Sequence, residues 1–142
     1  KDNLLAVMIG VLSGVLTSLA SILLLCLVFH MNHAEYITLL PKSITTAIGM
    51  SVVEELGGYT TITVATIIVT GILGNVLAEP VCHLFAIKSP IAKGLALGTS
   101  AHAIGTSKAM QLGEVEGAMA SLAIVVCGIM TVVGASVFAN FL

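Results

Sequence analysis

Three long runs of apolar residues alternate along the chain with shorter segments that are rich in Gly, Ser and Thr. The first run, residues 4–29, contains no charged residue. As a helix it would be about 39 Å long, against about 30 Å for the hydrocarbon core of a bilayer, so it can cross with tilt. Two further runs have spanning length: residues 62–78, which reach Phe85 if the helix continues past Pro80, and residues 118–141. The pattern predicts three transmembrane helices.

The composition supports an all-α integral membrane protein. The chain is 58% hydrophobic and 8% charged, whereas about a quarter of the residues of a soluble domain are charged. Residues 4–29 are too long for the apolar region of a secretory signal and show no small-residue cleavage site, which indicates a permanent span. Because the chain opens at Lys1 without a Met and three helices bury little, we expect a fragment lacking N-terminal helices, or a homo-oligomer. The net charge of −2, without a basic run, argues against nucleic-acid binding.

The chain also contains an internal repeat. An offset of 56 residues lays SITTAIGMSVVEELG (43–57) on TSAHAIGTSKAMQLG (99–113), with six identities in fifteen positions. The same offset lays the span 4–29 on 60–85. The sequence therefore predicts a first unit at about 4–58, a second unit at about 60–114, and a final helix at 118–141 within a single membrane domain.

The two repeated segments do not resemble ordinary spans, because each has helix-weakening residues at its centre. These residues are Ser43, Thr45, Thr46 and Gly49 in the first segment, and Gly98, Thr99, Ser100, His102, Gly105, Thr106 and Ser107 in the second. An interrupted backbone is tolerated in a bilayer only where protein or a water-filled cavity satisfies the freed N–H and C=O groups. The segments are candidate re-entrant hairpins or broken helices that line a cavity.

The lysines favour the hairpin alternative. Lys1 precedes the first span, and Lys88 and Lys93 precede the second broken segment. The positive-inside rule places all three on the cytoplasmic side, which requires an even number of crossings between them. One helix, a hairpin that returns to its own side, and a second helix satisfy this requirement. The two units then have opposite orientations, as in an inverted-topology repeat.

The second broken segment carries the strongest candidate chemistry. His102 and Lys108 flank Gly105 and Thr106, and half-helix N-termini with nearby hydroxyls favour anions. The candidate substrate-binding residues are Ser43, Thr45, Thr46, Thr99, Ser100, His102, Thr106, Ser107 and Lys108. Lys42, after Pro41, has a similar place at the mouth of the first segment. An alternative stays open: the hydroxyls satisfy backbone carbonyls, and Lys108 extends to the lipid headgroups.

Other polar residues have simpler interpretations. Two acidic pairs are expected at the water interface, and Glu79 with Pro80 is consistent with a helix end. Gly10 and Gly14, on a small-residue face, predict helix packing or oligomerisation. The acidic pairs are Glu54 with Glu55 and Glu114 with Glu116. The cysteines are expected as small apolar core residues: Cys26, Cys82 and Cys127. His30 and His33 are expected to face water. We therefore predict no metal site, and since no nucleophile elbow or Walker loop is present, no cofactor and no enzyme activity.

Three motifs carry a family resemblance. They are LLPKSITTAIGMSVVEELGG (39–58), TGILGNVLAEP (70–80) and IKSPIAKGLALGTSAHAIGTSKAMQLGEVEGAMASLA (87–123). Together they resemble the LrgB/CidB family of bacterial inner-membrane proteins, over practically the whole chain and in the C-terminal portion of such a protein. Ala47 departs from the family pattern, in which a proline is expected after the Thr-Thr pair; this affects only the sharpness of the break.

The resemblance implies a multi-pass protein of the bacterial inner membrane with one of two roles. Some members are described as antiholin-like regulators of murein hydrolase export and autolysis that act with a small LrgA/CidA-type membrane partner. Related members are described as carriers of pyruvate, or of glycolate and glycerate in the plastid envelope. Because broken segments with hydroxyls and cations suit an organic anion, we expect a transporter of monocarboxylates similar to pyruvate, lactate or glycolate. The antiholin-like regulator is the alternative.

Overall fold

The computed structural model describes residues 4–142, and every regular element in this range is helical. The elements are α1 (Leu4–Val28), α2 (His33–Leu39), α3 (Thr46–Leu56), α4 (Thr60–Leu84), α5 (Pro90–Leu112), α6 (Glu114–Phe138) and the short 3-10 helix η1 (Ala139–Phe141). The all-α class predicted from the sequence is confirmed. Lys1, which was used to predict the orientation of the first span, lies outside the described residues.

Three of the helices are long and apolar enough to cross a membrane: α1, α4 and α6. Each has 25 residues, which corresponds to about 37 Å of helix and exceeds the hydrocarbon thickness. Their most apolar windows have mean hydropathies of 2.5, 1.9 and 2.5. The three predicted spans are therefore present, and the protein is a multi-pass membrane protein.

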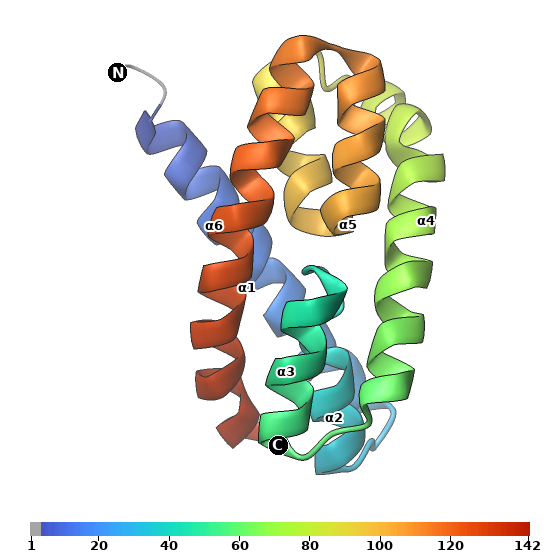
Figure 1. Ribbon diagram of the computed structural model, residues 1–142, viewed down its shortest axis with the longest axis vertical. Helices are drawn as coiled ribbons and strands as arrows, with labels where there is room; N and C mark the ends of the chain where they lie inside the picture. The colour runs from blue at the N-terminus through green and yellow to red at the C-terminus, as the bar shows by residue number, and fades with distance from the viewer. Residues whose placement is uncertain (1–3) are drawn as a thin grey trace.

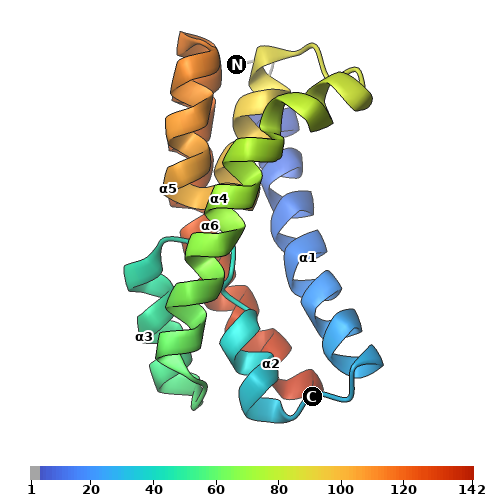
Figure 2. The ribbon, with the colours of Figure 1, turned by 90° about the vertical axis from the view of Figure 1, so that its right-hand side faces the viewer.

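Two helix boundaries make the sequence-based expectation more exact. The helix α4 continues past Pro80 to Leu84, which is the longer of the two alternatives that the sequence left open. Figure 2 shows that the last turns of α4 bend away from the rest of the helix, as expected where a proline removes a backbone hydrogen bond. The helix α6 begins at Glu114 rather than at Ala118. Its first turn contains Glu114 and Glu116, whose negative charges suit the positive end of the helix dipole.

The helices α2 and α3 fold back on each other as a helical hairpin, which we call hairpin one (residues 33–56; Figure 1). A capping box starts α2: the Asn32 side chain accepts from the Glu35 N–H, and the Glu35 carboxylate accepts from the Asn32 N–H. The hairpin ends at Gly57, whose φ of 85° is a left-handed conformation that glycine adopts readily.

The break in hairpin one is shorter than the sequence suggested. Ser43 and Thr45 lie in the non-helical connection, whereas Thr46 and Gly49 lie within α3. Gly49 has a packing role, because a Cβ at this position would lie 2.6 Å from the Ile67 side chain. Only part of the Gly/Ser/Thr cluster therefore interrupts the helix.

The helix α5 is interrupted at Ala101 and His102, which have non-helical backbone angles. At His102 the values are φ 42° and ψ −134°. Figure 1 shows that the chain reverses at this point, so that residues 90–100 and 103–112 form the two arms of a second hairpin, hairpin two. Gly98 and Gly105 lie in the regular arms.

The two hairpins lie at opposite ends of the molecule, and their tips face each other at mid-height (Figures 1 and 2). The same views show that α1 and α4 run in opposite directions. The starts of these helices, Leu4 and Thr60, are 56 positions apart, as are their ends, Val28 and Leu84. The boundaries of α1 and α4 are therefore separated by the same 56 residues as the two units of the sequence repeat.

Hairpin two is packed closely between α4 and α6. A Cβ on Gly98 would lie 2.5 Å from the Ala120 carbonyl oxygen of α6, and a Cβ on Gly74 of α4 would collide with Ala101. By contrast, a Cβ on Gly10 of α1 would lie 3.3 Å from the end of the Leu95 side chain. The break of hairpin two is therefore enclosed by neighbouring helices.

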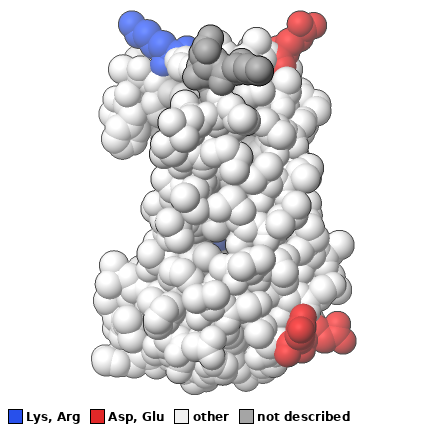
Figure 3. All heavy atoms as spheres, turned by 90° about the vertical axis from the view of Figure 1, so that its left-hand side faces the viewer, with Lys and Arg blue, Asp and Glu red and all other residues white. Residues whose placement is uncertain are grey.

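The outer surface suits lipid. Large apolar side chains of the three long helices are exposed, such as Leu16 of α1 at 46%, Leu73 of α4 at 53% and Ile129 of α6 at 65%. In Figure 3 the acidic and most basic side chains lie at the two ends, and the band between them is almost free of charge. Such a band is expected where a protein faces hydrocarbon.

We predict that Gly98→Ala and Gly10→Ala have opposite effects on stability. The first substitution forces a methyl group against a rigid backbone carbonyl, and overpacking of this kind costs about 1–3 kcal/mol. The second meets a flexible side-chain end, and replacement of a helical glycine by alanine gains up to about 1 kcal/mol. Thermal unfolding of the two purified variants in detergent measures the difference. Equal unfolding temperatures would contradict the packing described for hairpin two.

Candidate functional site

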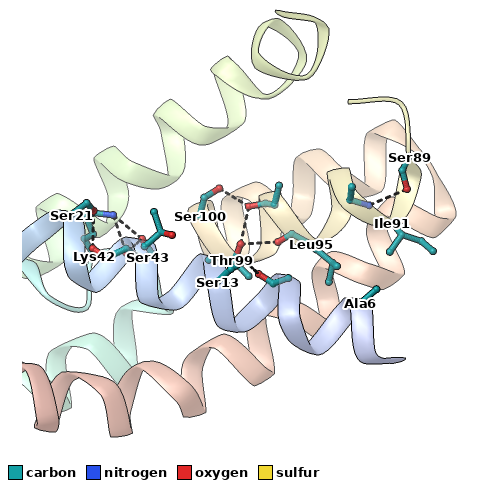
Figure 4. Close-up of a pocket in the computed structure, with 16 residues that line it drawn as sticks. Ala6, Ser13, Ser21, Lys42, Ser43, Ser89, Ile91, Leu95, Thr99 and Ser100 are labelled. Atoms are coloured by element: carbon teal, nitrogen blue, oxygen red, sulfur yellow. Dashed lines mark hydrogen bonds between the residues drawn. The ribbon is translucent and has the colours of Figure 1, made fainter. Parts of the chain in front are cut away.

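A cavity of about 770 Å³ lies between α1, the tip of hairpin one and the first arm of hairpin two (Figure 4). It follows α1 from Ala6 to Ser21 and the first arm from Ser89 to Ser100. Eight of its lining residues carry hydroxyl groups and one carries an amine: Ser13, Thr17, Ser18, Ser21, Ser43, Ser89 at the outer end, Thr99, Ser100 and Lys42. A polar cavity therefore extends from one end of the molecule to its middle.

Lys42 lies at the inner part of this cavity. Its Nζ donates hydrogen bonds to the Ser18 Oγ (3.1 Å) and to the Ser43 Oγ (3.0 Å). The two hydroxyl oxygens are 3.1 Å apart and share a hydrogen bond. Ser18 comes from α1, whereas Lys42 and Ser43 come from the connection of hairpin one, so that the cluster joins the first span to the hairpin tip.

The donors of this cluster are not all used. An ammonium group has three N–H donors, and two of those of Lys42 are taken by Ser18 and Ser43. The two serines have one O–H donor each, and one of these is taken by the bond between them. One N–H and one O–H therefore stay free, and two neighbouring donors match the two oxygens of a carboxylate.

The charge of Lys42 has no protein partner among residues 4–142. In this range a single ion pair is present, and it joins Lys108 to Glu79. An ammonium group at membrane depth is costly unless a counter-charge or polar groups surround it, and such residues usually mark a substrate path. Figure 3 shows blue atoms at the bottom of a hollow at mid-height, away from the charged ends. The cavity thus presents an uncompensated positive charge.

The remaining hydroxyls mostly serve the backbone. Thr99 Oγ1 donates to the Leu95 carbonyl at 2.8 Å, and Ser100 Oγ donates to the Ala96 carbonyl at 2.6 Å. Ser13 and Ser21 donate in the same way within α1. Because each hydroxyl has one hydrogen, these groups offer only lone pairs to a ligand. The alternative left open by the sequence, that hydroxyls satisfy carbonyls, holds for these residues.

His102 faces α4 and not the cavity. It is 3% exposed, and its Nε2 lies 2.8 Å from the Ile67 carbonyl oxygen. Since a carbonyl oxygen only accepts, the Nε2 carries the proton of this bond. Thr106 Oγ1 in turn donates to the His102 carbonyl at 2.9 Å. These contacts fix the tip of hairpin two against the middle of α4.

The other predicted residues lie apart from the cavity as well. Lys108 forms the ion pair with Glu79 of α4, and Ser107 is exposed. Thr45 precedes α3, and its Oγ1 is buried without a hydrogen-bond partner. Of the nine predicted substrate-binding residues, the structure brings Ser43, Thr99 and Ser100 to the cavity and leaves Thr45, Thr46, His102, Thr106, Ser107 and Lys108 outside it.

The sequence reasoning missed the contribution of α1. Gly10 and Gly14 were interpreted as a packing face, and this is confirmed within the chain, because Leu95 and Thr99 pack against them. The same face continues into Ser18, which bonds Lys42. Two features of the sequence could have indicated this site. One is the row of hydroxyl residues on a span that also carries packing glycines, and the other is the lysine directly after Pro41.

The structure also describes the residues that had simpler interpretations. Cys26 and Cys127 are buried and Cys82 is half-buried, all as free thiols. Glu54, Glu55 and Glu114 are exposed, as are His30 and His33, whereas Glu116 is 9% exposed at the start of α6. Within residues 4–142, no group of three His, Cys, Asp or Glu side chains is placed to hold a metal ion.

The fold defines a class: an all-helical, multi-pass membrane protein with a polar cavity reaching mid-height. The chain belongs to the LrgB-like family, whose model matches residues 1–141. The resemblance expected from the three motifs is therefore confirmed. No solved structure matches the chain.

Three relatives illustrate the similarity. The chain is 37% identical over 136 residues to the antiholin-like protein LrgB of Bacillus subtilis, covering 96% of this chain and 59% of the relative. It is 37% identical over 131 residues to the holin-like protein CidB of Staphylococcus aureus, covering 92% and 57%. Identity to the protein YwbG of Bacillus subtilis is 34% over 142 residues, covering 100% and 63%. The chain thus spans about 57% to 63% of the length of these relatives, and none of their names denotes an enzyme.

We predict that His102→Leu destabilises the protein by about 1–3 kcal/mol, because the buried Ile67 carbonyl loses its side-chain partner. Ser107→Ala, an exposed substitution on the same arm, is the matched control and should change stability by less than about 0.5 kcal/mol. Chemical denaturation of both variants in detergent provides the comparison. If His102→Leu unfolds like the control, the His102 bond does not hold the hairpin.

Proposed function

We propose that the protein carries small monocarboxylates, similar to pyruvate, lactate or glycolate, across the bacterial cell membrane. The observation that carries the proposal is the uncompensated ammonium group of Lys42 in a polar cavity at mid-height. A carboxylate that leaves water loses its hydration, and a fixed cation with adjacent donors offsets this loss. A lysis-related role alone would not require such a site.

The free donors support a carboxylate as the ligand. One N–H of Lys42 and one O–H of the Ser18 and Ser43 pair stay available, and a carboxylate accepts two such bonds side by side. In this proposal Lys42 has the role that the sequence alone had suggested for Lys108. Ser43 is a contact of the substrate, whereas Thr99 and Ser100 form the polar wall that the substrate passes.

We also infer that the two units form an inverted-topology repeat with re-entrant hairpins. The shared offset supports this arrangement: α3 ends at Leu56, and α5 ends at Leu112, again 56 positions apart. The hairpins enter from opposite ends, and the inner end of the cavity, with Lys42 and Ser43, lies where their tips face each other. Transporters built from inverted repeats bind their substrates at such a position. By the positive-inside rule, Lys88 and Lys93 support a cytoplasmic position for the outer end of the cavity.

A second function stays open. Relatives at 37% identity are named antiholin-like and holin-like, which favours a regulator of murein hydrolase export and autolysis that acts with a small LrgA/CidA-type membrane partner. A regulator predicts altered envelope integrity without saturable flux. Uptake assays with and without the partner, in proteoliposomes, separate the two functions.

We predict that Lys42→Gln weakens uptake of labelled pyruvate, lactate or glycolate by about tenfold or more in apparent affinity, the loss expected when a charged hydrogen bond is removed. Lys108→Gln is the matched control, because that lysine is paired with Glu79 outside the cavity. Initial rates against substrate concentration in proteoliposomes give both affinities.

Two outcomes would contradict the proposal. One is the absence of saturable uptake of every small carboxylate by protein that is shown to be folded, which would favour the regulator. The other is a loss of affinity in Lys108→Gln with none in Lys42→Gln. The second result would move the anion site to hairpin two.

We predict that single cysteines at Asn32 and Ser89, in a background without the native cysteines, are labelled from opposite sides of the membrane. Asn32 precedes hairpin one, and Ser89 precedes hairpin two. If each hairpin returns to its own side, one full crossing separates these positions. An impermeant thiol reagent applied to cells and to inverted vesicles measures the side. Labelling of both positions from one side would rule out the re-entrant model.

A further inference from the structure

A second groove, with a volume of about 1040 Å³, lies where α4 meets α5, at the end of the molecule opposite hairpin one. It is lined among others by Glu79 and His83 of α4, and by Lys88 and Lys93 beyond it. It shares no lining residue with the Lys42 cavity. The groove is therefore a separate feature that the proposed transport function does not use.

The charge of this groove is positive. Glu79 is its one acidic lining residue, and the carboxylate is already bonded to Lys108 from hairpin two. Within residues 4–142, Lys88 and Lys93 have no carboxylate at ion-pair distance. Two ammonium groups and the His83 imidazole thus share one concave surface with a single carboxylate, Glu79, which is already bonded to Lys108.

The groove lies at the end of α4, where the lipid headgroups are expected if this helix crosses a bilayer. Pro80 bends the last turns of α4 across the end of the bundle (Figure 2). This bent segment exposes Leu84 at 77% and Phe85 at 69%, which are apolar side chains beside a basic groove. Interfacial segments that recognise anionic lipid typically combine two kinds of residue. Apolar side chains insert among the acyl chains, and neighbouring lysines contact the phosphates.

We propose that the groove binds the phosphate of an anionic phospholipid, with Lys88 and Lys93 as its charged contacts. The acyl chains lie along Leu84 and Phe85. An unspecific role of the lysines, namely orientation by the positive-inside rule, predicts no preference among lipids. A headgroup site predicts that anionic lipid binds in preference to zwitterionic lipid, and that the preference depends on the two lysines.

The test uses the purified chain in detergent and a fluorescent phosphatidylglycerol as the probe. We expect unlabelled phosphatidylglycerol to compete, whereas phosphatidylcholine and soluble glycerol phosphate compete at least about tenfold more weakly. The double variant Lys88→Gln, Lys93→Gln should lose about tenfold or more in affinity for the probe. The charge-preserving double variant Lys88→Arg, Lys93→Arg is the matched control and should retain binding.

Three results would overturn the proposal. Equal competition by phosphatidylcholine would show that charge is not recognised, and equal competition by glycerol phosphate would show that a soluble phosphate is the ligand. Unchanged binding by the glutamine variant would show that the lysines are not the contacts. If that variant fails to fold, the competition series with the unaltered chain and the arginine variant still decides. The readout is lipid binding and is independent of carboxylate uptake.

Discussion

A backbone N–H or C=O group inside a bilayer has no water to bond, so a helix can be interrupted there only where protein encloses the interruption. Hairpin two satisfies this constraint through small residues on its neighbours. A Cβ on Gly71 of α4 would lie 2.7 Å from the His102 ring, so that glycine leaves the room in which the imidazole reaches the Ile67 carbonyl. The reversal of the chain at mid-height, and with it the cavity, depends on this close approach.

The spans could be predicted because hydrophobic length is a local property of the sequence. Residues 4–29 agree with α1 (Leu4–Val28) almost to the residue. The breaks were harder, because Gly and Thr have two uses that composition does not separate. His102 interrupts α5, whereas Gly98 lies in a regular arm and permits contact with Ala120. Which glycine serves which purpose depends on the neighbouring helices, and these come from distant parts of the chain.

The site was only partly predictable for the same reason. Lys108 lies among hydroxyls in sequence and was the natural candidate, yet Glu79, 29 positions away, is its partner. Lys42 stood beside a single proline, and its partner Ser18 belongs to a span interpreted as a packing face. A salt bridge or a shared hydrogen bond between separate helices leaves no spacing pattern in one sequence. The charge balance of each lysine became visible only when the helices were assembled.

The number of positive charges around the cavity determines how much ligand charge it can neutralise. Among the described residues that line it, Lys42 is the sole cation, and its neighbours Ser18 and Ser43 are neutral. A ligand with one negative charge would leave the interior electrically neutral while bound. A dianion would bring a second charge with no fixed partner, and an uncompensated charge in a medium of low dielectric constant is strongly disfavoured. If the cavity binds a carboxylate as proposed, its single lysine favours a ligand with one negative charge, whatever the shape or size of that ligand.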